Sequence, residues 1–209
     1  MEEEKTNDED GIKVILVGDS GVGKTSLINI SMGMKFNNKE KISSASTFSI
    51  KKINIDEKEY KLHLWDTMGQ ESLRYLTKLF FNNAKIVIFV YDISVRGSFD
   101  SLPDWVKDVK ERVGDNIVKG VVANKSDLYL KEKVKEEEGK EYANKIGASF
   151  LTVSAKVDVP EKFENFMELL AREYIFNGEI TERKTFYLNK GNPKPKKIVV
   201  IKRIYSEFI

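Results

Sequence analysis

The 209-residue chain contains no cysteine, and this absence removes several kinds of chemistry at once. Disulfides, thiolate metal sites and cysteine nucleophiles are excluded, as is a prenyl group attached within this chain. No apolar run approaches the roughly 18 residues of a membrane span, and the N-terminus lacks the apolar core of a signal peptide, so we expect a cytoplasmic protein. The formal net charge of +2 is too close to neutral to indicate a nucleic-acid partner.

The chain does contain one loop with a clear chemical pattern, Gly18–Thr25, which reads G-D-S-G-V-G-K-T. The spacing G-x-x-x-x-G-K-[ST] is typical of a phosphate-binding loop (P-loop), in which backbone N–H groups turn inward around a phosphate. Lys24 would place its ammonium on the outer phosphates, and Thr25 would offer its hydroxyl to Mg²⁺. A β-rich apolar segment, residues 12–17, precedes the loop, and residues 26–30 can open a helix whose N-terminus favours phosphate charge. This order disfavours an ordinary glycine-rich turn.

The other regular segments predict an α/β fold. Strands are expected at residues 12–17, 48–55, 60–65, 85–92, 117–123 and 148–153. Helices are expected from the P-loop to about Met34 and at residues 73–81, 98–113, 133–146 and 161–174. The second and third strands form an antiparallel hairpin, and the others alternate with helices. We therefore predict three layers around a mostly parallel sheet with one antiparallel edge strand, whose ligands bind at the carboxyl ends of strands.

The two ends of the chain differ in composition from the centre. Residues 1–10 carry six acidic side chains and predict a disordered, solvated leader. Residues 11–175 form the predicted globular domain. Residues 176–209 are interpreted as a basic linker followed by a strand-like tail, Ile198–Ile201, which is similar to residues 13–17 but lacks a glycine loop after it. The single histidine, His63, occupies the polar phase of a strand and is interpreted as a surface residue.

Two polar clusters, each following a predicted strand, indicate which base the bound nucleotide carries. Together with the P-loop, the sequences N-K-S-D at 124–127 and S-A-K at 154–156 resemble the N-K-x-D and S-A-K motifs of the Ras superfamily of small GTPases, over residues 11–175. The resemblance implies that Asp127 accepts two hydrogen bonds from guanine, a pair that adenine cannot donate. The implied nucleotide-binding residues are Gly18, Ser20, Gly21, Val22, Gly23, Lys24, Thr25, Ser26, Phe36, Gly69, Asn124, Lys125, Asp127, Ser154, Ala155 and Lys156.

Roles follow from the same resemblance. Asn124 and Lys125 would brace the loop and stack against the base, and the Ala155 amide would read the guanine oxygen. Ser154 and Lys156 complete the S-A-K motif, and Phe36 stands where the family places an aromatic edge over the base.

The sequence D-T-M-G-Q at 66–70 resembles the D-T-A-G-Q of the second switch in this family. The resemblance implies that Asp66 holds Mg²⁺ through a water and that the Gly69 amide binds the γ-phosphate. Gln70 would orient the attacking water as the catalytic residue, with slow intrinsic hydrolysis until a partner supplies an arginine. Within the superfamily the chain is most similar to Rab, on K-L-H-L-W-D-T at 61–67 and Y-D-I-S at 91–94.

Three features depart from the family pattern. Ser43-Ser44-Ala45 stands where the first switch has T-I-G, so Ser43 keeps a hydroxyl for Mg²⁺ but lacks the β-branched stiffness of threonine. The implied metal ligands are therefore Thr25, Ser43 and Asp66. Met68 replaces a small alanine near the γ-phosphate, and no C-terminal cysteine is present to carry a lipid anchor.

These observations predict a Rab-like GTPase that binds GDP or GTP with Mg²⁺, hydrolyses GTP slowly and acts in vesicle trafficking. Effector, exchange and activating proteins would bind its switch regions, and any association with endomembranes would be peripheral and through partners. The alternative is a guanine-nucleotide-bound scaffold with little switching, the first half of a tandem G-domain protein. Asp127 together with Asn124 disfavours a third possibility, an unrelated P-loop kinase.

Overall fold

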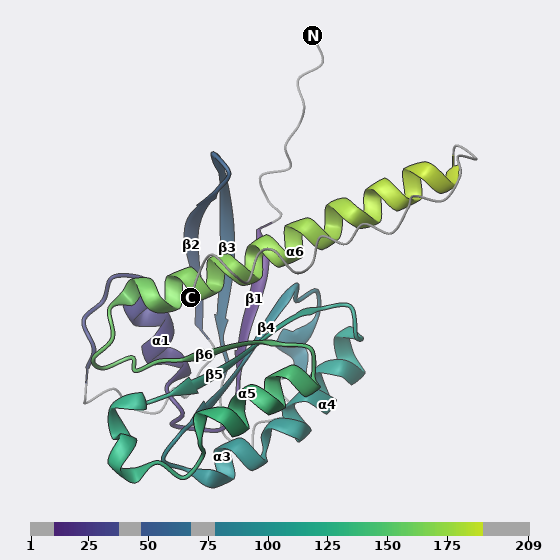
Figure 1. Cartoon of the computed structure of the whole chain (residues 1–209). Helices are drawn as coiled ribbons and strands as arrows, with labels where there is room; N and C mark the ends of the chain where they lie inside the picture. Colours follow the sequence, from purple (N-terminus) through teal and green to yellow (C-terminus); the bar gives the residue numbers. More distant parts are fainter. Residues whose placement is uncertain (1–10, 38–46, 68–77, 190–209) are drawn as a thin grey trace. The chain divides into compact units, whose positions relative to one another are not determined.

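A six-stranded sheet is the centre of the computed structural model, which describes residues 11–37, 47–67 and 78–189 (Figure 1). The strands are β1 (Ile12–Val17), β2 (Thr47–Ile55), β3 (Lys58–Asp66), β4 (Ile86–Asp92), β5 (Val118–Asn124) and β6 (Ser149–Thr152). Their order is β2-β3-β1-β4-β5-β6, and β2 is antiparallel to β3 while the other neighbouring pairs are parallel. The predicted sheet, mostly parallel with one antiparallel edge strand, is confirmed.

Helices cover both faces of this sheet. They are α1 (Lys24–Ser31), the 3₁₀ helix η2 (Lys78–Phe81), α3 (Arg96–Asp100), α4 (Leu102–Val113), the 3₁₀ helix η3 (Ser126–Lys131), α5 (Glu136–Lys145) and α6 (Pro160–Asn189). Alternate residues of the central strands, such as Ile15 and Phe89, pack with α3, α4 and α5 in one buried cluster that includes Trp105 and Ala143. The period-two alternation of strand side chains sends the intervening residues to the opposite face.

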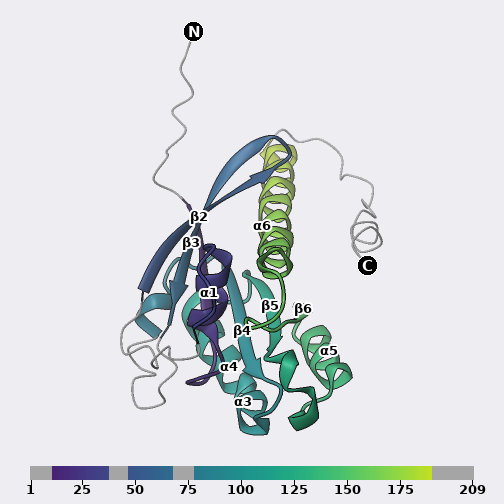
Figure 2. The same cartoon turned by 90° about the vertical axis from the view of Figure 1, so that its left-hand side faces the viewer.

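The helices α1 and α6 lie on that opposite face. Lys51 of β2 shows this, because its ammonium donates to the carbonyl of Ser31 at the end of α1 (2.6 Å) and pairs with Glu164 of α6 (2.9 Å). Gly120 of β5 allows α6 to approach closely, since a Cβ there would stand 2.9 Å from ring or methyl carbons of both Phe166 and Leu170. Figure 2 shows α1 and the beginning of α6 from a second direction.

Before α6, helix boundaries differ from the sequence-based predictions at three places. α1 ends at Ser31 because Gly33 takes a left-handed φ of 78° and the N–H of Met34 returns to the carbonyl of Asn29 (2.9 Å). The predicted helix at 98–113 is two helices, and Pro103, which has no N–H, lies in the first turn of the second. α5 begins at Glu136, after a buried Val134, rather than at residue 133.

The chain divides into two units, residues 1–174 and 175–209. The part of the second unit that the structure describes, residues 175–189, is the C-terminal stretch of α6, so the first part of the predicted linker is helical. This stretch contains no proline, and most of its residues are compatible with a helix, whereas the first proline after it is Pro193. The predicted leader (1–10), the strand-like tail (198–201) and most of the predicted helix at 73–81 lie outside the described residues.

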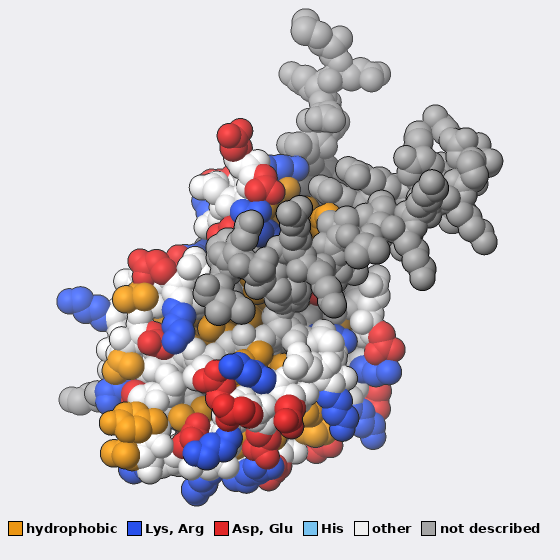
Figure 3. All heavy atoms as spheres, viewed as in Figure 1, with side chains coloured by type: hydrophobic (Ala, Val, Ile, Leu, Met, Phe, Trp, Pro, Cys, Tyr) orange, Lys and Arg blue, Asp and Glu red, His pale blue; other side chains and the backbone are white. Residues whose placement is uncertain are grey.

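The surface carries charges of both signs. On the face that Figure 3 shows, Lys and Arg side chains are interspersed with Asp and Glu side chains. Some form short-range pairs on helices, such as Lys140 with Glu136 of α5 at 2.6 Å. None of the helices in the described part of the chain is long and apolar enough to cross a bilayer.

Candidate nucleotide-binding site

The P-loop joins β1 to α1 and has the backbone that its glycines were expected to provide. Gly18, Gly21 and Gly23 have φ values of 145°, 76° and 100°. A Cβ on Gly18 would stand 2.1 Å from the carbonyl oxygen of Val90, and a Cβ on Gly23 would stand 2.3 Å from Nδ2 of Asn124. Side chains are therefore excluded at both ends of the loop by backbone conformation and by contact.

Lys24 places a buried ammonium inside this loop. The residue is 5% exposed, and its Nζ donates to the carbonyls of Gly18 and Asp19, each at 2.8 Å. Burial lowers the pKa of Lys24 to about 8, whereas the charges of Asp66 and Asp19 act in the opposite direction. A cation that has lost much of its hydration and is surrounded by backbone dipoles is suited to a phosphate group.

Thr25 and Asp66 form a hydroxyl–carboxylate pair beside Lys24. Thr25 Oγ1 donates to Asp66 Oδ2 at 2.5 Å, and Asp66, the last residue of β3, is 1% exposed. Within residues 11–37, 47–67 and 78–189 no group of three or more His, Cys, Asp or Glu could form a metal cage. A hydroxyl and one carboxylate fit Mg²⁺, because Mg²⁺ retains waters and takes its other ligands from substrate phosphates. The residues present therefore fit this ion.

Asn124 connects the P-loop to the two other polar clusters. It ends β5 and is buried; its Nδ2 donates to the carbonyl of Val22 (2.8 Å), and its Oδ1 accepts from the N–H of Ala155 (3.3 Å). Lys125 adds a second connection, since its Nζ donates to the carbonyl of Gly21 at 2.7 Å. Lys125 has a left-handed φ of 62°, which turns the chain from β5 into η3.

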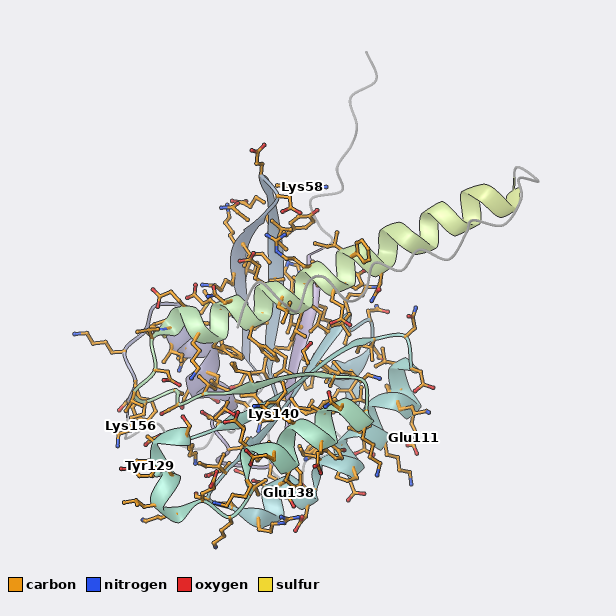
Figure 4. All side chains as sticks on the ribbon, in the orientation of Figure 1. Lys58, Glu111, Tyr129, Glu138, Lys140 and Lys156 are labelled. Carbon is orange, nitrogen blue, oxygen red and sulfur yellow. The ribbon has the colours of Figure 1, made fainter. Side chains whose placement is uncertain are left out.

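Asp127 is positioned by the S-A-K segment. Its Oδ1 accepts from Ser154 Oγ at 2.6 Å, and Lys156 Nζ lies 4.0 Å from its Oδ2. Ser154 is itself fixed, because its N–H donates to Asp158 (2.7 Å) and its hydroxyl accepts from the N–H of Lys156 (3.2 Å). Figure 4 labels Lys156 of the S-A-K segment and Tyr129 of η3. The carboxylate is held by a neutral donor and leaves further acceptor positions for a base.

Comparison with known proteins agrees with this geometry. Residues 13–174 match the sequence profile of the Ras family. The chain belongs to the Ras family. It is 36% identical over 163 residues to the Ras-related protein Rab-2B of Dictyostelium discoideum, which covers 77% of this chain and 81% of the relative. The predicted resemblance is confirmed: this is a Rab-like, GTP-binding small GTPase, in a group that acts in vesicle trafficking.

The structure of this Ras-family chain brings the predicted clusters together as far as they are described, because Asp66 of the second switch also contacts Thr25 of the P-loop. The P-loop, the N-K-S-D segment and the S-A-K segment are joined by the contacts of Asn124, Lys125 and Asp127. Ser20 and Gly21 are exposed, Ser26 is half-buried at the start of α1, and Phe36 is half-buried in the segment after it. Of the second switch, Asp66 and Thr67 are described. Ser43, Met68, Gly69 and Gln70 lie outside the described residues.

Sequence reasoning missed the residues that hold these clusters in place without being part of the predicted nucleotide contacts. Asp92, predicted as the last residue of a strand and as part of Y-D-I-S, pairs with Lys125 at 2.8 Å. Asp19 lies in the P-loop but is not among the predicted nucleotide-binding residues, and its side chain accepts hydrogen bonds from Ser101, just before α4, and from Trp105 of α4. A carboxylate at the carboxyl end of a parallel strand was an available signal for Asp92, but no local pattern pointed to Trp105.

Proposed function

We propose that this Rab-like GTPase binds GDP and GTP, each with Mg²⁺, through residues 11–175, hydrolyses GTP slowly and works as a switch. The observation that carries the proposal is the position of Asn124. One side-chain amide joins the P-loop at Val22 to the S-A-K segment at Ala155, so the loops for phosphate and for base are held in one site. The absence of a side chain at Gly23 leaves room for this amide, because a Cβ there would stand 2.3 Å from Asn124 Nδ2.

The phosphate end of the site uses Lys24, Thr25 and Asp66. Lys24 would exchange its two carbonyl acceptors for phosphate oxygens, a charge-assisted interaction that favours the protonated amine. Thr25 and Asp66 would hold Mg²⁺, which neutralises phosphate charge when bound. Ser43 is the third proposed ligand, from the sequence.

The base end uses Asp127, whose carboxylate would accept from two guanine donors, and the N–H of Ala155, which would donate to the guanine oxygen. Adenine presents the opposite pattern at these positions and would leave a carboxylate unpaired in a partly buried place. The side chain of Asp127 is 16% exposed, so water replaces the missing donors only in part.

For hydrolysis we propose that Gln70 orients the attacking water and that the Gly69 amide binds the γ-phosphate. The chain offers no arginine in these motifs, so a partner would supply one and the intrinsic rate would be low. Effector, exchange and activating proteins would bind the switch regions. We place the protein in the cytoplasm, peripheral on endomembranes through such partners.

A second candidate is a guanine-nucleotide-bound scaffold with little hydrolysis or switching, as one part of a tandem G-domain protein. The sequence observations that favour it are Ser43 and Ala45 in the first switch and Met68 in the second. These residues alter the switch regions and leave the base and phosphate contacts of Asp127 and Lys24 intact.

Two measurements test these proposals. A fluorescent GDP titration should show tight binding to the wild type and almost none to Lys24→Ala, with exposed Lys35→Ala as the matched control. Single-turnover GTP hydrolysis, with and without added activating protein, should give slow turnover that Gln70→Leu slows further. Normal GTP binding by Lys24→Ala would contradict the site. Tight GTP binding without any hydrolysis, stimulated or not, would favour the scaffold.

A further inference from the structure

The segment from Asp92 to Trp105 connects the end of β4 to the first turns of α4, and it contacts two separate loops of the nucleotide site. We propose that this segment braces the site, with Asp92, Ser101 and Trp105 as positioning residues that slow the release of bound guanine nucleotide. The inference rests on the proposed nucleotide site and adds residues that do not belong to its motifs.

The first contact of this brace is with the P-loop. Asp19 Oδ1 accepts from Ser101 Oγ and from Trp105 Nε1, each at 2.8 Å. Trp105 is fully buried, so its indole is fixed by the core beneath α4. The backbone carbonyl of the same Asp19 is one of the two acceptors of Lys24 Nζ. Through Asp19, the position of α4 therefore fixes one of the backbone acceptors of Lys24, the residue that would contact phosphate.

The second contact is with the guanine-side loop. Asp92 is 4% exposed, and its Oδ2 lies 2.8 Å from Lys125 Nζ. Its Oδ1 accepts from both the N–H and the hydroxyl of Ser94, at 2.8 and 2.7 Å. Lys125 also donates to the carbonyl of Gly21. Asp92 thus holds the ammonium of Lys125, the lysine of the N-K-S-D segment, where that ammonium also donates to the P-loop.

The turn between these contacts is itself tied together. Ser98 Oγ accepts from the N–H of Asp92 (3.0 Å) and donates to the carbonyl of Val95 (2.7 Å), so the chain from β4 to α3 is closed on itself. A brace needs this rigidity, because a positioning residue holds a site only if its own conformation is fixed.

Arg96 supplies a matched control from the same segment. Its guanidinium is bound to Asp100 and to Glu138 of α5, at 2.9 and 2.7 Å, and these partners are not part of either nucleotide loop. Figure 4 labels Glu138 on α5, apart from Lys156 of the S-A-K segment. Arg96→Gln removes contacts of the segment without removing a contact to the site.

The experiment measures the dissociation rate of a fluorescent GDP analogue from the full chain, chased with excess GDP. Ser101→Ala, Trp105→Phe and Asp92→Asn should each speed release by about five- to tenfold, the effect of losing one hydrogen bond worth about 1 kcal/mol. Arg96→Gln should stay within about twofold of the wild type, as a contact outside the site predicts. Asp19→Asn, which keeps an acceptor oxygen, should release GDP more slowly than Asp19→Ala.

A spectroscopic measurement distinguishes positioning from loss of fold. The indole N–H resonance of Trp105 in a ¹H–¹⁵N spectrum should shift in Asp19→Ala and remain near its wild-type position in Asp19→Asn. Folded variants that all release GDP at the wild-type rate would overturn the brace. Release that simply follows thermal stability, with Arg96→Gln as fast as the rest, would also overturn it. A wild type that retains no GDP would instead contradict the proposed site itself.

Discussion

Gly23 of the P-loop and the side chain of Asn124 occupy neighbouring space so closely that a Cβ at position 23 would stand 2.3 Å from Asn124 Nδ2. Gly23 also has a φ of 100°, which L-residues rarely adopt. A glycine at position 23 therefore has two effects. It permits the backbone conformation of the P-loop, and it leaves the space that Asn124 of the N-K-S-D segment occupies.

Gly23→Ala should weaken GDP binding by at least about tenfold, because it combines about 1–2 kcal/mol of backbone strain with displacement of Asn124 from Val22. Gly33→Ala is the matched control. Gly33 has a φ of 78° but nothing within 4 Å of a Cβ, so this variant should lose stability and keep its GDP affinity. Equal losses of affinity in the two variants, by fluorescent GDP titration, would refute the contact.

Asp127→Asn should reduce guanine affinity by about 3 kcal/mol, because a charged acceptor of two hydrogen bonds is lost. The amide should also shift preference toward xanthine, whose edge offers an acceptor where guanine has a donor. Competition between GDP and XDP measures this change, with the exposed Asp115→Asn as the control. Unchanged GDP affinity in Asp127→Asn would remove the guanine assignment.

Tyr91→Phe should raise the free energy of unfolding by about 1 kcal/mol. The Tyr91 hydroxyl is buried with no hydrogen-bond partner in the described part of the chain, and burial raises its pKa, so it stays neutral. A Cβ on Gly139 would stand 2.3 Å from this oxygen, so Gly139→Ala should destabilise less in the Tyr91→Phe background than in the wild type. Denaturant unfolding checks both effects. Tyr129→Phe, at an exposed tyrosine, should be neutral.

Glu173→Gln should stabilise the protein at neutral pH and lose this effect in acid. Burial raises the pKa of Glu173, although Lys119 acts in the opposite direction. The folded state therefore disfavours the carboxylate, and this cost is present above the folded pKa and absent below the unfolded pKa near 4.5. Thermal melts should show a higher midpoint for Glu173→Gln at pH 7, with a difference that shrinks as the pH falls through this window. An unchanged difference across the window would contradict the assignment, and exposed Glu161→Gln is the control.

The strands were predictable from two patterns: residues 60–65 alternate polar and apolar side chains, as a strand with one exposed face does, and residues 85–92 form the continuous apolar run of a strand buried on both faces. The residues at which helices begin and end were harder to predict from the sequence. The break between α3 and α4 falls next to Pro103, inside one continuous pattern of helically spaced apolar residues, and α6 continues past residue 175 into the segment that was predicted as a linker.

The candidate site was predictable where its contacts are local in sequence, as in the P-loop and at residues 124–127. The supporting residues were not, because the contact of Trp105 with Asp19 joins positions 86 residues apart and leaves no periodic signal. Asp92 ends β4, and Lys125 directly follows the end of the neighbouring strand β5, so their pairing becomes visible only with the register of β4 and β5.

The position of Asn124 between two loops has a thermodynamic consequence for recognition. If one side chain is shared by the parts that contact the base and the phosphates, then occupation of either part favours the bound arrangement of the other. Linkage requires the coupling to be reciprocal, so phosphates should sharpen the preference for guanine over adenine by the same factor by which guanine strengthens phosphate binding more than adenine does. Discrimination between bases should therefore be larger for nucleotides than for nucleosides, and the gap should close in Asn124→Ala.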